Sequence, residues 1–248
     1  MLTESEVLST LQMVQNEHLD VRTVTLGVSL YDCQSDDVQR LTQNIYNKIY
    51  RLGRSFVALC DQVGEKYGIE VVNKRIAVSP AALVAAGCRP EEFVEVARCL
   101  DRAAHDVGVD FIGGFTALVE KGMAPGDTHL LEAMPEALAS TERVCASVNV
   151  ASSRSGLNMD AIARMGEVLK ETAAATADRD GLGCAKLCVF ANLPEDVPFM
   201  AGAYLGAGEP DAVINVGVSG PGVVKKAIDR AVAANPELSL GELSETIK

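Results

Sequence analysis

The chain has 248 residues, of which 48% are hydrophobic and 23% charged, an ordinary composition for a globular protein. Its formal net charge of −12 argues against nucleic acid and anionic membranes as partners, because both require clustered Lys and Arg. Seven irregularly spaced cysteines argue against a secreted disulfide framework, and the sequence shows neither a signal-type apolar segment nor an apolar run long enough to span a membrane. We therefore expect a cytoplasmic protein.

Strands and helices are expected to alternate along the chain. Alternating, β-branched stretches predict strands at residues 21–30, 69–79, 143–150, 187–192 and 212–218, with a short strand at 109–112 that ends in Gly113-Gly114. Helical spacing predicts helices at 36–67, 90–105, 127–140, 159–175 and 219–233, and capping-box patterns predict short terminal helices that begin at Thr3 and Ser239. This alternation predicts a single α/β domain over residues 1–248, built from parallel βαβ units.

Several predicted strands carry aliphatic side chains on one face and small or polar side chains on the other. In the strand at 143–150 the polar face holds Cys145, Ser147 and Asn149, and in the strand at 212–218 it holds Asn215 and Gly217. Because side chains alternate between the two faces of a strand, the aliphatic face is expected to pack on helices. The polar face would then border water, a loop or a ligand. A sheet with one face open to solvent is an equally good explanation.

Basic groups and glycines in or beside these strands are candidates for binding an anion. Arg22 and Arg75 suit bidentate binding of a carboxylate or phosphate, although pairing with Asp32 or Asp110 would explain them as well. After the last strand, the V-S-G-P-G segment would offer backbone N–H donors at a helix start, from Ser219, Gly220 and Gly222. That segment lacks the lysine of a phosphate-binding loop, so a tight strand-to-helix turn is the favoured explanation.

Three residues are candidates for acid, base or nucleophile: Asp32, Asp110 and Cys145. Asp32 follows the first strand, at the end where ligand sites gather in parallel sheets. The alternative for Asp110 is a structural salt bridge, and most free cysteines merely pack in the core. Asn149 and Asn215 could orient a ligand or satisfy turns. The cysteines form no C-x-x-C pair, so no metal site is expected, and no cofactor is predicted.

Longer motifs carry a resemblance to a known family. They are D-V-R-T-V-T-L-G-V-S-L-Y-D-C, V-N-K-R-I-A-V-S-P, V-D-F-I-G-G-F-T-A-L-V-E-K-G, V-C-A-S-V-N-V-A-S-S-R-S-G-L-N-M, P-F-M-A-G-A-Y and V-I-N-V-G-V-S-G-P-G-V-V-K. Over nearly its whole length the chain resembles the N-terminal part of the uncharacterised family called domain of unknown function 711, a pyruvate formate-lyase-like family. The resemblance implies a ten-stranded α/β barrel with a loop in its interior, of which this chain would form only part.

The resemblance also limits the chemistry. The chain has no adjacent Cys-Cys pair and no R-V-x-G-Y glycyl loop, so glycyl radical catalysis is not expected. A partial barrel would expose strand edges, which predicts a homo-oligomer or association with a missing C-terminal half. The leading hypothesis is a protein that binds a small anionic metabolite at the barrel mouth, with enzymatic turnover left open. The alternative is a non-catalytic binding or regulatory protein that acts through a partner.

Overall fold

The computed structural model describes residues 20–199 and 202–247. Contacts divide these residues into two compact units. The larger unit comprises Val24–Cys60 and Asn73–Asn215, and the smaller one comprises the described parts of residues 1–23, 61–72 and 216–248. The prediction of a single domain over residues 1–248 stays a prediction, because this division describes contacts and not independent folding. The predicted helix that begins at Thr3 lies outside the described residues.

Seven strands of the described chain form one mixed sheet, in the order β5-β4-β3-β2-β1-β7, with β6 paired to β4. β2 pairs with β3, β3 with β4 and β4 with β6, all in parallel, whereas the short β5 is antiparallel to β4. The strands are β1 (Asp20–Val28), β2 (Val71–Val78), β3 (Phe111–Leu118), β4 (Val144–Ser152), β5 (Gly156–Leu157), β6 (Leu187–Ala191) and β7 (Ala212–Ser219). The expected α/β class with parallel βαβ units is therefore confirmed, whereas a closed barrel is not part of what the structure shows.

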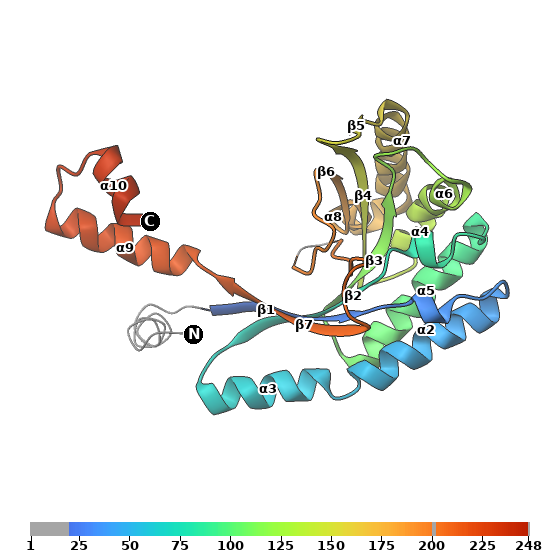
Figure 1. Ribbon diagram of the computed structural model, residues 1–248, viewed down its shortest axis with the longest axis horizontal. Coiled ribbons are helices and arrows are strands. Elements are labelled where there is room, and N and C mark those ends of the chain that lie inside the picture. Colours follow the sequence, from blue (N-terminus) through green and yellow to red (C-terminus); the bar gives the residue numbers. More distant parts are fainter. Residues whose placement is uncertain (1–19, 200–201, 248) are drawn as a thin grey trace. The chain divides into compact units, whose positions relative to one another are not determined.

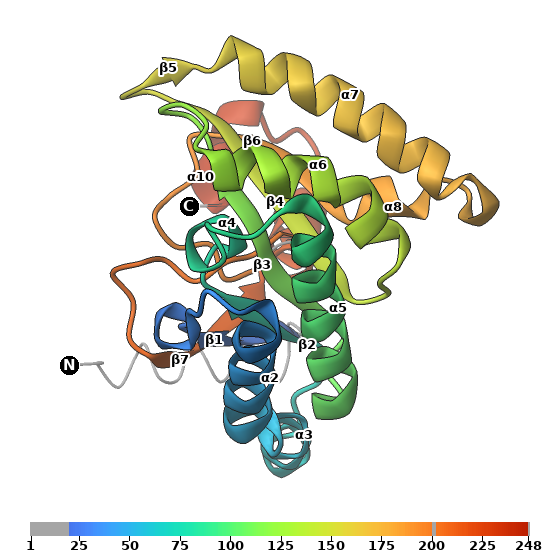
Figure 2. The same cartoon turned by 90° about the vertical axis from the view of Figure 1, so that its right-hand side faces the viewer.

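In the larger unit, four helices lie in a row over one face of the sheet (Figure 2). α2 packs on α5, α5 on α6, and α6 on α7, and their buried faces are aliphatic. These helices are α2 (Val38–Gly53), α5 (Pro90–Val107), α6 (Pro125–Ala139) and α7 (Met159–Ala175). Shorter helices complete the connections: η1 (Tyr31–Cys33), α4 (Ala81–Val84), η2 (Ala177–Arg179) and α8 (Leu182–Ala185). Asn158 caps α7 as its position in the sequence indicates, because its side chain accepts a hydrogen bond from the N–H of Ala161.

The opposite, polar face of the strands is covered by the chain itself. The described residues of the segment between β6 and β7 (192–199 and 202–211), which we call the covering loop, cross β3 and β4 on the side away from α5 and α6 (Figure 1). Ser147 Oγ donates to the carbonyl of Gly202 at 2.7 Å and lies 2.8 Å from Thr116 Oγ1, and Thr25 Oγ1 donates to the carbonyl of Pro198 at 2.7 Å. Of the three contents that the sequence left open for this face, a loop is the one found. The small polar side chains on this face supply hydrogen-bond partners for the backbone carbonyls of the loop.

Gly113 and Gly114 correct the prediction of a strand that ends at residue 112. β3 continues to Leu118, and the two glycines lie inside it, where the register with β4 shifts between Ile112 and Phe115. A Cβ at Gly113 would lie 2.1 Å from the carbonyl oxygen of Ala203, and Gly114 has a φ of 112°. These glycines therefore allow a bulge and the close approach of the covering loop, and they do not form a strand-to-helix turn.

The long helix predicted at 36–67 is two helices, α2 and α3 (Phe56–Tyr67). α2 ends at Gly53, where an added Cβ would lie 3.0 Å from the side chain of Val107 at the end of α5. Glycine lowers helix stability and permits this close packing, so the break falls there. The smaller unit contains α9 (Pro221–Ala234) and α10 (Leu240–Ile247), which pack on each other. No helix among the described residues is long and apolar enough to cross a membrane.

Candidate functional site

A cavity of about 320 Å³ lies at the carboxyl ends of the parallel strands in the larger unit. We call it the carboxyl-edge cavity. It is lined by Tyr31, Pro80, Leu83, Leu118, Glu120, Lys121, Asn149, Leu193, Pro194, Glu195, Tyr204, Ala207 and Gly208. These residues come from the segments that follow β1, β2 and β3, from β3 and β4 themselves, and from the covering loop, which follows β6. The cavity therefore lies where open parallel sheets generally hold their ligands.

Two side-chain oxygens of this cavity are buried without a hydrogen bond. Among the described residues, neither Glu120 Oε2 nor Asn149 Oδ1 has a hydrogen-bond partner. Asn149 is only 4% exposed, and it lies on the polar face of β4, two residues beyond Ser147. Leaving such a group unpaired costs about 1–3 kcal/mol, so buried acceptors of this kind require an explanation. Donors on a bound molecule would satisfy both.

The surroundings of the cavity are negatively charged. Burial, followed by the nearby carboxylates of Glu120, Asp196 and Glu195, raises the pKa of Tyr204 to about 12. The Tyr204 hydroxyl therefore keeps its proton, which it donates to the carbonyl of Pro194 at 2.7 Å. Burial raises the pKa of Asp127 as well, while the backbone N–H of Ala124 lowers it and the charge of Glu120 adds to the rise. Glu120 thus acts electrostatically on two neighbouring buried groups.

Asp32 belongs to a different polar cluster of the larger unit. The ammonium of Lys48, which is 5% exposed, lies 2.6 Å from Asp32 Oδ1 and 2.5 Å from Asp211 Oδ1. Burial lowers the pKa of Lys48, but the hydrogen bonds to Asp211 and Asp32 outweigh that effect, so the pKa is raised. The hydrogen bond from Lys48 also lowers the pKa of Asp32, against its partial burial. Burial, with the neighbouring Asp32 charge, raises the pKa of the Cys33 thiol to about 12, which keeps that thiol protonated.

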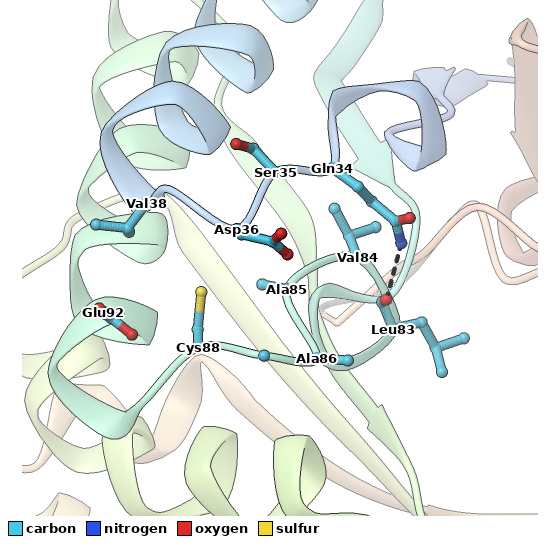
Figure 3. Close-up of a pocket in the computed structure, with 11 residues that line it drawn as sticks. Gln34, Ser35, Asp36, Val38, Leu83, Val84, Ala85, Ala86, Cys88 and Glu92 are labelled. Carbon is cyan, nitrogen blue, oxygen red and sulfur yellow. Dashed lines mark hydrogen bonds between the residues drawn. The ribbon is translucent and has the colours of Figure 1, made fainter.

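A second cavity of about 320 Å³ lies between the segment that follows β1 and the turn that follows α4 (Figure 3). Gln34 Nε2 donates to the carbonyl of Leu83 at 3.2 Å across this cavity, as the dashed line shows. Glu92, which lines this cavity, accepts from the backbone N–H of Arg89 at 2.8 Å and from the Arg89 guanidinium. Among the described residues that line this cavity, no side chain has a buried nitrogen or oxygen without a hydrogen bond. It is therefore a weaker candidate than the carboxyl-edge cavity.

Of the predicted site residues, Asn149 lines the carboxyl-edge cavity, whereas Arg75 and Asp110 do not. Arg75 Nη1 donates to the carbonyl of Phe199 at 3.0 Å, and its guanidinium lies 5.4 Å from the centre of the Phe111 ring. Asp110 Oδ2 accepts from the backbone N–H of Lys74 at 2.7 Å. Asp110 thus binds a backbone amide, and its carboxylate stabilises the turn that leads into β3.

Cys145 is 3% exposed on the polar face of β4, and burial is the main cause that raises the pKa of its thiol. A buried thiol with a raised pKa is a poor nucleophile at neutral pH. Asn215 is half-buried in β7. The remaining predicted residues belong to the smaller unit: Arg22 is exposed in β1, Ser219 ends β7, Gly220 precedes α9, and Gly222 lies in its first turn.

Sequence reasoning missed Glu120, Lys121, Tyr204 and Lys48. The segment A-L-V-E-K contains the signal for the first two, since an acid and a base follow an apolar run directly. The sequence could not place these two residues at a strand end, because the strand was expected to end at residue 112. Within the described part of the chain, no group of three or more His, Cys, Asp or Glu side chains is arranged to hold a metal ion.

Comparison with known proteins places the chain in a family. The model of the family described as "Uncharacterised ACR (DUF711)" matches residues 12–248. The "UPF0210 protein" of Syntrophobacter fumaroxidans is 65% identical over the whole chain, and that of Oleidesulfovibrio alaskensis is 64% identical; in each case the match covers 54% of the relative. The "UPF0210 protein" of Methanococcoides burtonii is 55% identical over 98% of the chain and 53% of the relative.

The chain thus spans about half the length of the curated relatives it matches. Its own match to the family model extends over nearly all of its residues. The chain belongs to the uncharacterised family DUF711, whose curated members are named UPF0210 proteins.

Proposed function

We propose that this chain binds a small polar metabolite in the carboxyl-edge cavity. One observation carries the proposal: Glu120 Oε2 and Asn149 Oδ1 are both buried without a hydrogen bond among the described residues, and both residues line this cavity. A volume of about 320 Å³ is at the lower end of the range typical of small-molecule sites. A ligand with N–H or O–H donors would restore the hydrogen bonds that the fold leaves open.

The covering loop supports the same proposal, because it forms one wall of the cavity and is firmly held. Leu205 N donates to the carbonyl of Val78 at 3.0 Å, and Gly206 N donates to Asp196 Oδ1 at 2.8 Å. Tyr204 N and the carbonyl of Val197 are joined at 2.9 Å. A wall that is fixed by its own hydrogen bonds holds the lining groups in place before a ligand arrives, which reduces the entropy cost of binding.

The anionic metabolite predicted from the sequence is an alternative occupant. Its arginines do not line the carboxyl-edge cavity, since Arg75 contacts Phe199 and Phe111, and Arg22 belongs to the other compact unit. If an anion is bound through Arg75, the Arg75→Ala variant should lose the binding of anions. Under our proposal the same variant retains ligand binding in the carboxyl-edge cavity.

The direct test is ligand-observed NMR of the 248-residue chain against pools of small metabolites. Asn149→Leu removes the unpaired amide at similar volume, and Glu120→Gln removes the carboxylate charge. Glu132→Gln is the matched control, because Glu132 is exposed on α6. We expect binders that the first two variants lose and the control retains. Binders that all variants retain, or none at all, would contradict the proposal.

Turnover distinguishes the two functional classes left open by the sequence. An enzyme would convert the identified binder into a product, and Glu120 is the lining carboxylate with a buried, unpaired oxygen that could exchange a proton with it. A regulatory protein would release the binder unchanged. Incubation of the binder with wild-type chain and with Glu120→Gln, followed by mass spectrometry, separates these outcomes.

We also propose that the sheet is part of a larger barrel, which a second copy or a further half of the family protein would complete. β6 pairs with β4 on one side, and Val189 within β6 is 38% exposed. Exposed edges with apolar side chains are sites where further strands add. Because relatives are almost twice as long as this chain, additional sequence exists in the family for that role. Light scattering of the purified chain tests self-association, and Val189→Lys should weaken it.

A further inference from the structure

The kind of ligand follows from which groups in the carboxyl-edge cavity can accept and which can donate. Glu120 in its ionised form only accepts hydrogen bonds, so its buried Oε2 can be satisfied only by a donor. The side-chain amide of Asn149 can turn to present either its oxygen or its NH2 group. Asn149 can therefore bind either a donor or an acceptor on the ligand, whereas Glu120 requires a donor and favours a positively charged one.

Two other acidic groups around the cavity are already engaged. Asp127 Oδ2 accepts from the backbone N–H of Ala124 at 2.9 Å, and Asp196 Oδ1 accepts from that of Gly206 at 2.8 Å. The Tyr204 hydroxyl, which could have donated to a ligand, donates to Pro194 instead. Glu120 Oε2 is the acidic oxygen that the described structure buries and leaves open.

The lining charges favour a cation as well. The ionisable carboxylates that line the cavity are those of Glu120 and Glu195, and the lining ammonium is that of Lys121, which is exposed. The arginines that would hold an anion are absent from this lining. A low-dielectric cavity strengthens the attraction between a buried carboxylate and a cationic donor.

Resting on the proposed function, we infer that the ligand of the carboxyl-edge cavity enters it with a cationic nitrogen, such as a primary ammonium group. The N–H donors of that group bind Glu120 Oε2 and Asn149 Oδ1. Charge-assisted hydrogen bonds of this kind are about twice as strong as neutral ones, so an amine should bind more tightly than an alcohol of the same shape. A cavity of about 320 Å³ admits a ligand of a few carbon atoms.

Three four-carbon probes with different end groups test this inference, and the diamine and the diol share the same four-methylene chain. Isothermal titration of the full chain with 1,4-diaminobutane, 1,4-butanediol and succinate compares ammonium, hydroxyl and carboxylate ends. We expect the diamine to bind at least about 10-fold more tightly than the diol, and succinate to bind weakest. Glu120→Gln should reduce the affinity for the diamine by about 10- to 100-fold and abolish its preference over the diol.

The possible outcomes separate the inference from the function on which it rests. If the diol or succinate binds as tightly as the diamine, and Asn149→Leu abolishes that binding, the cavity is a binding site but its ligand is not cationic. If the diamine binds equally well to wild type, Glu120→Gln and Asn149→Leu, it binds elsewhere, and the inference fails. If none of the probes binds, the inference fails too, while the metabolite pools still decide the proposed function. Glu132→Gln is again the control that should change nothing.

Discussion

Two polar clusters at the same end of the larger unit differ in one respect. At Lys48, the buried ammonium is paired: it binds Asp32 and Asp211, whose carboxylates reach solvent. In the carboxyl-edge cavity, Glu120 Oε2 and Asn149 Oδ1 are buried and remain open among the described residues. A cluster whose buried polar groups bind one another contributes to the stability of the fold. Buried acceptors that have no donor indicate a place where a ligand can bind. This difference is the basis for placing the function at Glu120 and Asn149 and not at Asp32.

The largest expected effect is on the paired cluster. The double substitution Asp32→Asn, Asp211→Asn would leave the Lys48 ammonium buried without a counter-charge, and removing the partners of a buried charge costs about 3 kcal/mol or more. Urea unfolding would measure this loss. Lys48→Met should cost less, because it leaves two solvent-exposed carboxylates and no buried charge. Equal losses in both variants would show that the ammonium is not the buried member.

A smaller effect is expected where the covering loop touches β3. Gly113→Ala would place a methyl group 2.1 Å from the carbonyl oxygen of Ala203, so the loop must shift, at a cost of about 2 kcal/mol. Because the loop forms a wall of the carboxyl-edge cavity, ligand binding should weaken too. Gly166→Ala in α7, which has open space around it, should instead stabilise by about 0.5–1 kcal/mol. Thermal unfolding compares the two, and a neutral Gly113→Ala would contradict the close approach.

Next in size is the polar pairing on β4. Ser147→Ala removes the hydroxyl that donates to Gly202 and accepts from Thr116, so we expect a loss of about 1 kcal/mol. Ser155→Ala is the matched control, because its hydroxyl bonds to Ser152 at an exposed site. Chemical denaturation of both variants measures the difference. No loss for Ser147→Ala would mean that the covering loop is not held by this hydroxyl.

The smallest effect is a pH dependence of the paired cluster. The pKa of Asp32 is lowered in the folded state by Lys48, so its contribution is fully present above the ordinary value of 3.8 and is lost as pH falls through the lowered pKa. Between pH 5 and pH 3, wild-type chain should therefore lose more thermal stability than Asp32→Asn. The difference is expected to be small because Asp32 is largely exposed. Identical pH profiles would show that Lys48 does not bind Asp32 in solution.

The sequence predicts most of the elements and the polar face of β4, because both follow from short periodic patterns. The expected packing of the aliphatic face on helices is wrong for β7, where Ile214, Val216 and Val218 are exposed. Cys145, Ser147 and Asn149 lie on one face of β4 as alternation predicts, and the loop that covers them was one of the expected contents. The family was recognised from the same strand motifs, and the comparisons confirm it. The sequence identifies Asn149 as a candidate because the alternation of side chains along one strand is enough to place it on the polar face.

The rest of the site depends on contacts between distant segments. Glu120 was missed because Gly113-Gly114 indicated the end of a strand, whereas the need for those glycines lies with Ala203, 90 residues away. Lys48 was missed because its partners Asp32 and Asp211 are 16 and 163 residues distant. Local patterns contain no information about such pairs, nor about the hydrogen bonds that remain open.

The most direct test of the central claim is the free energy of unfolding of Asn149→Leu in urea, without added ligand. If Asn149 Oδ1 is kept open for a ligand, replacing the amide with an apolar side chain of similar size relieves a buried unpaired group. The unliganded variant should then be as stable as wild type or more stable, by up to about 1 kcal/mol, in contrast to Ser147→Ala. A loss as large as that of Ser147→Ala would show that the amide is paired in the fold, and would contradict the account.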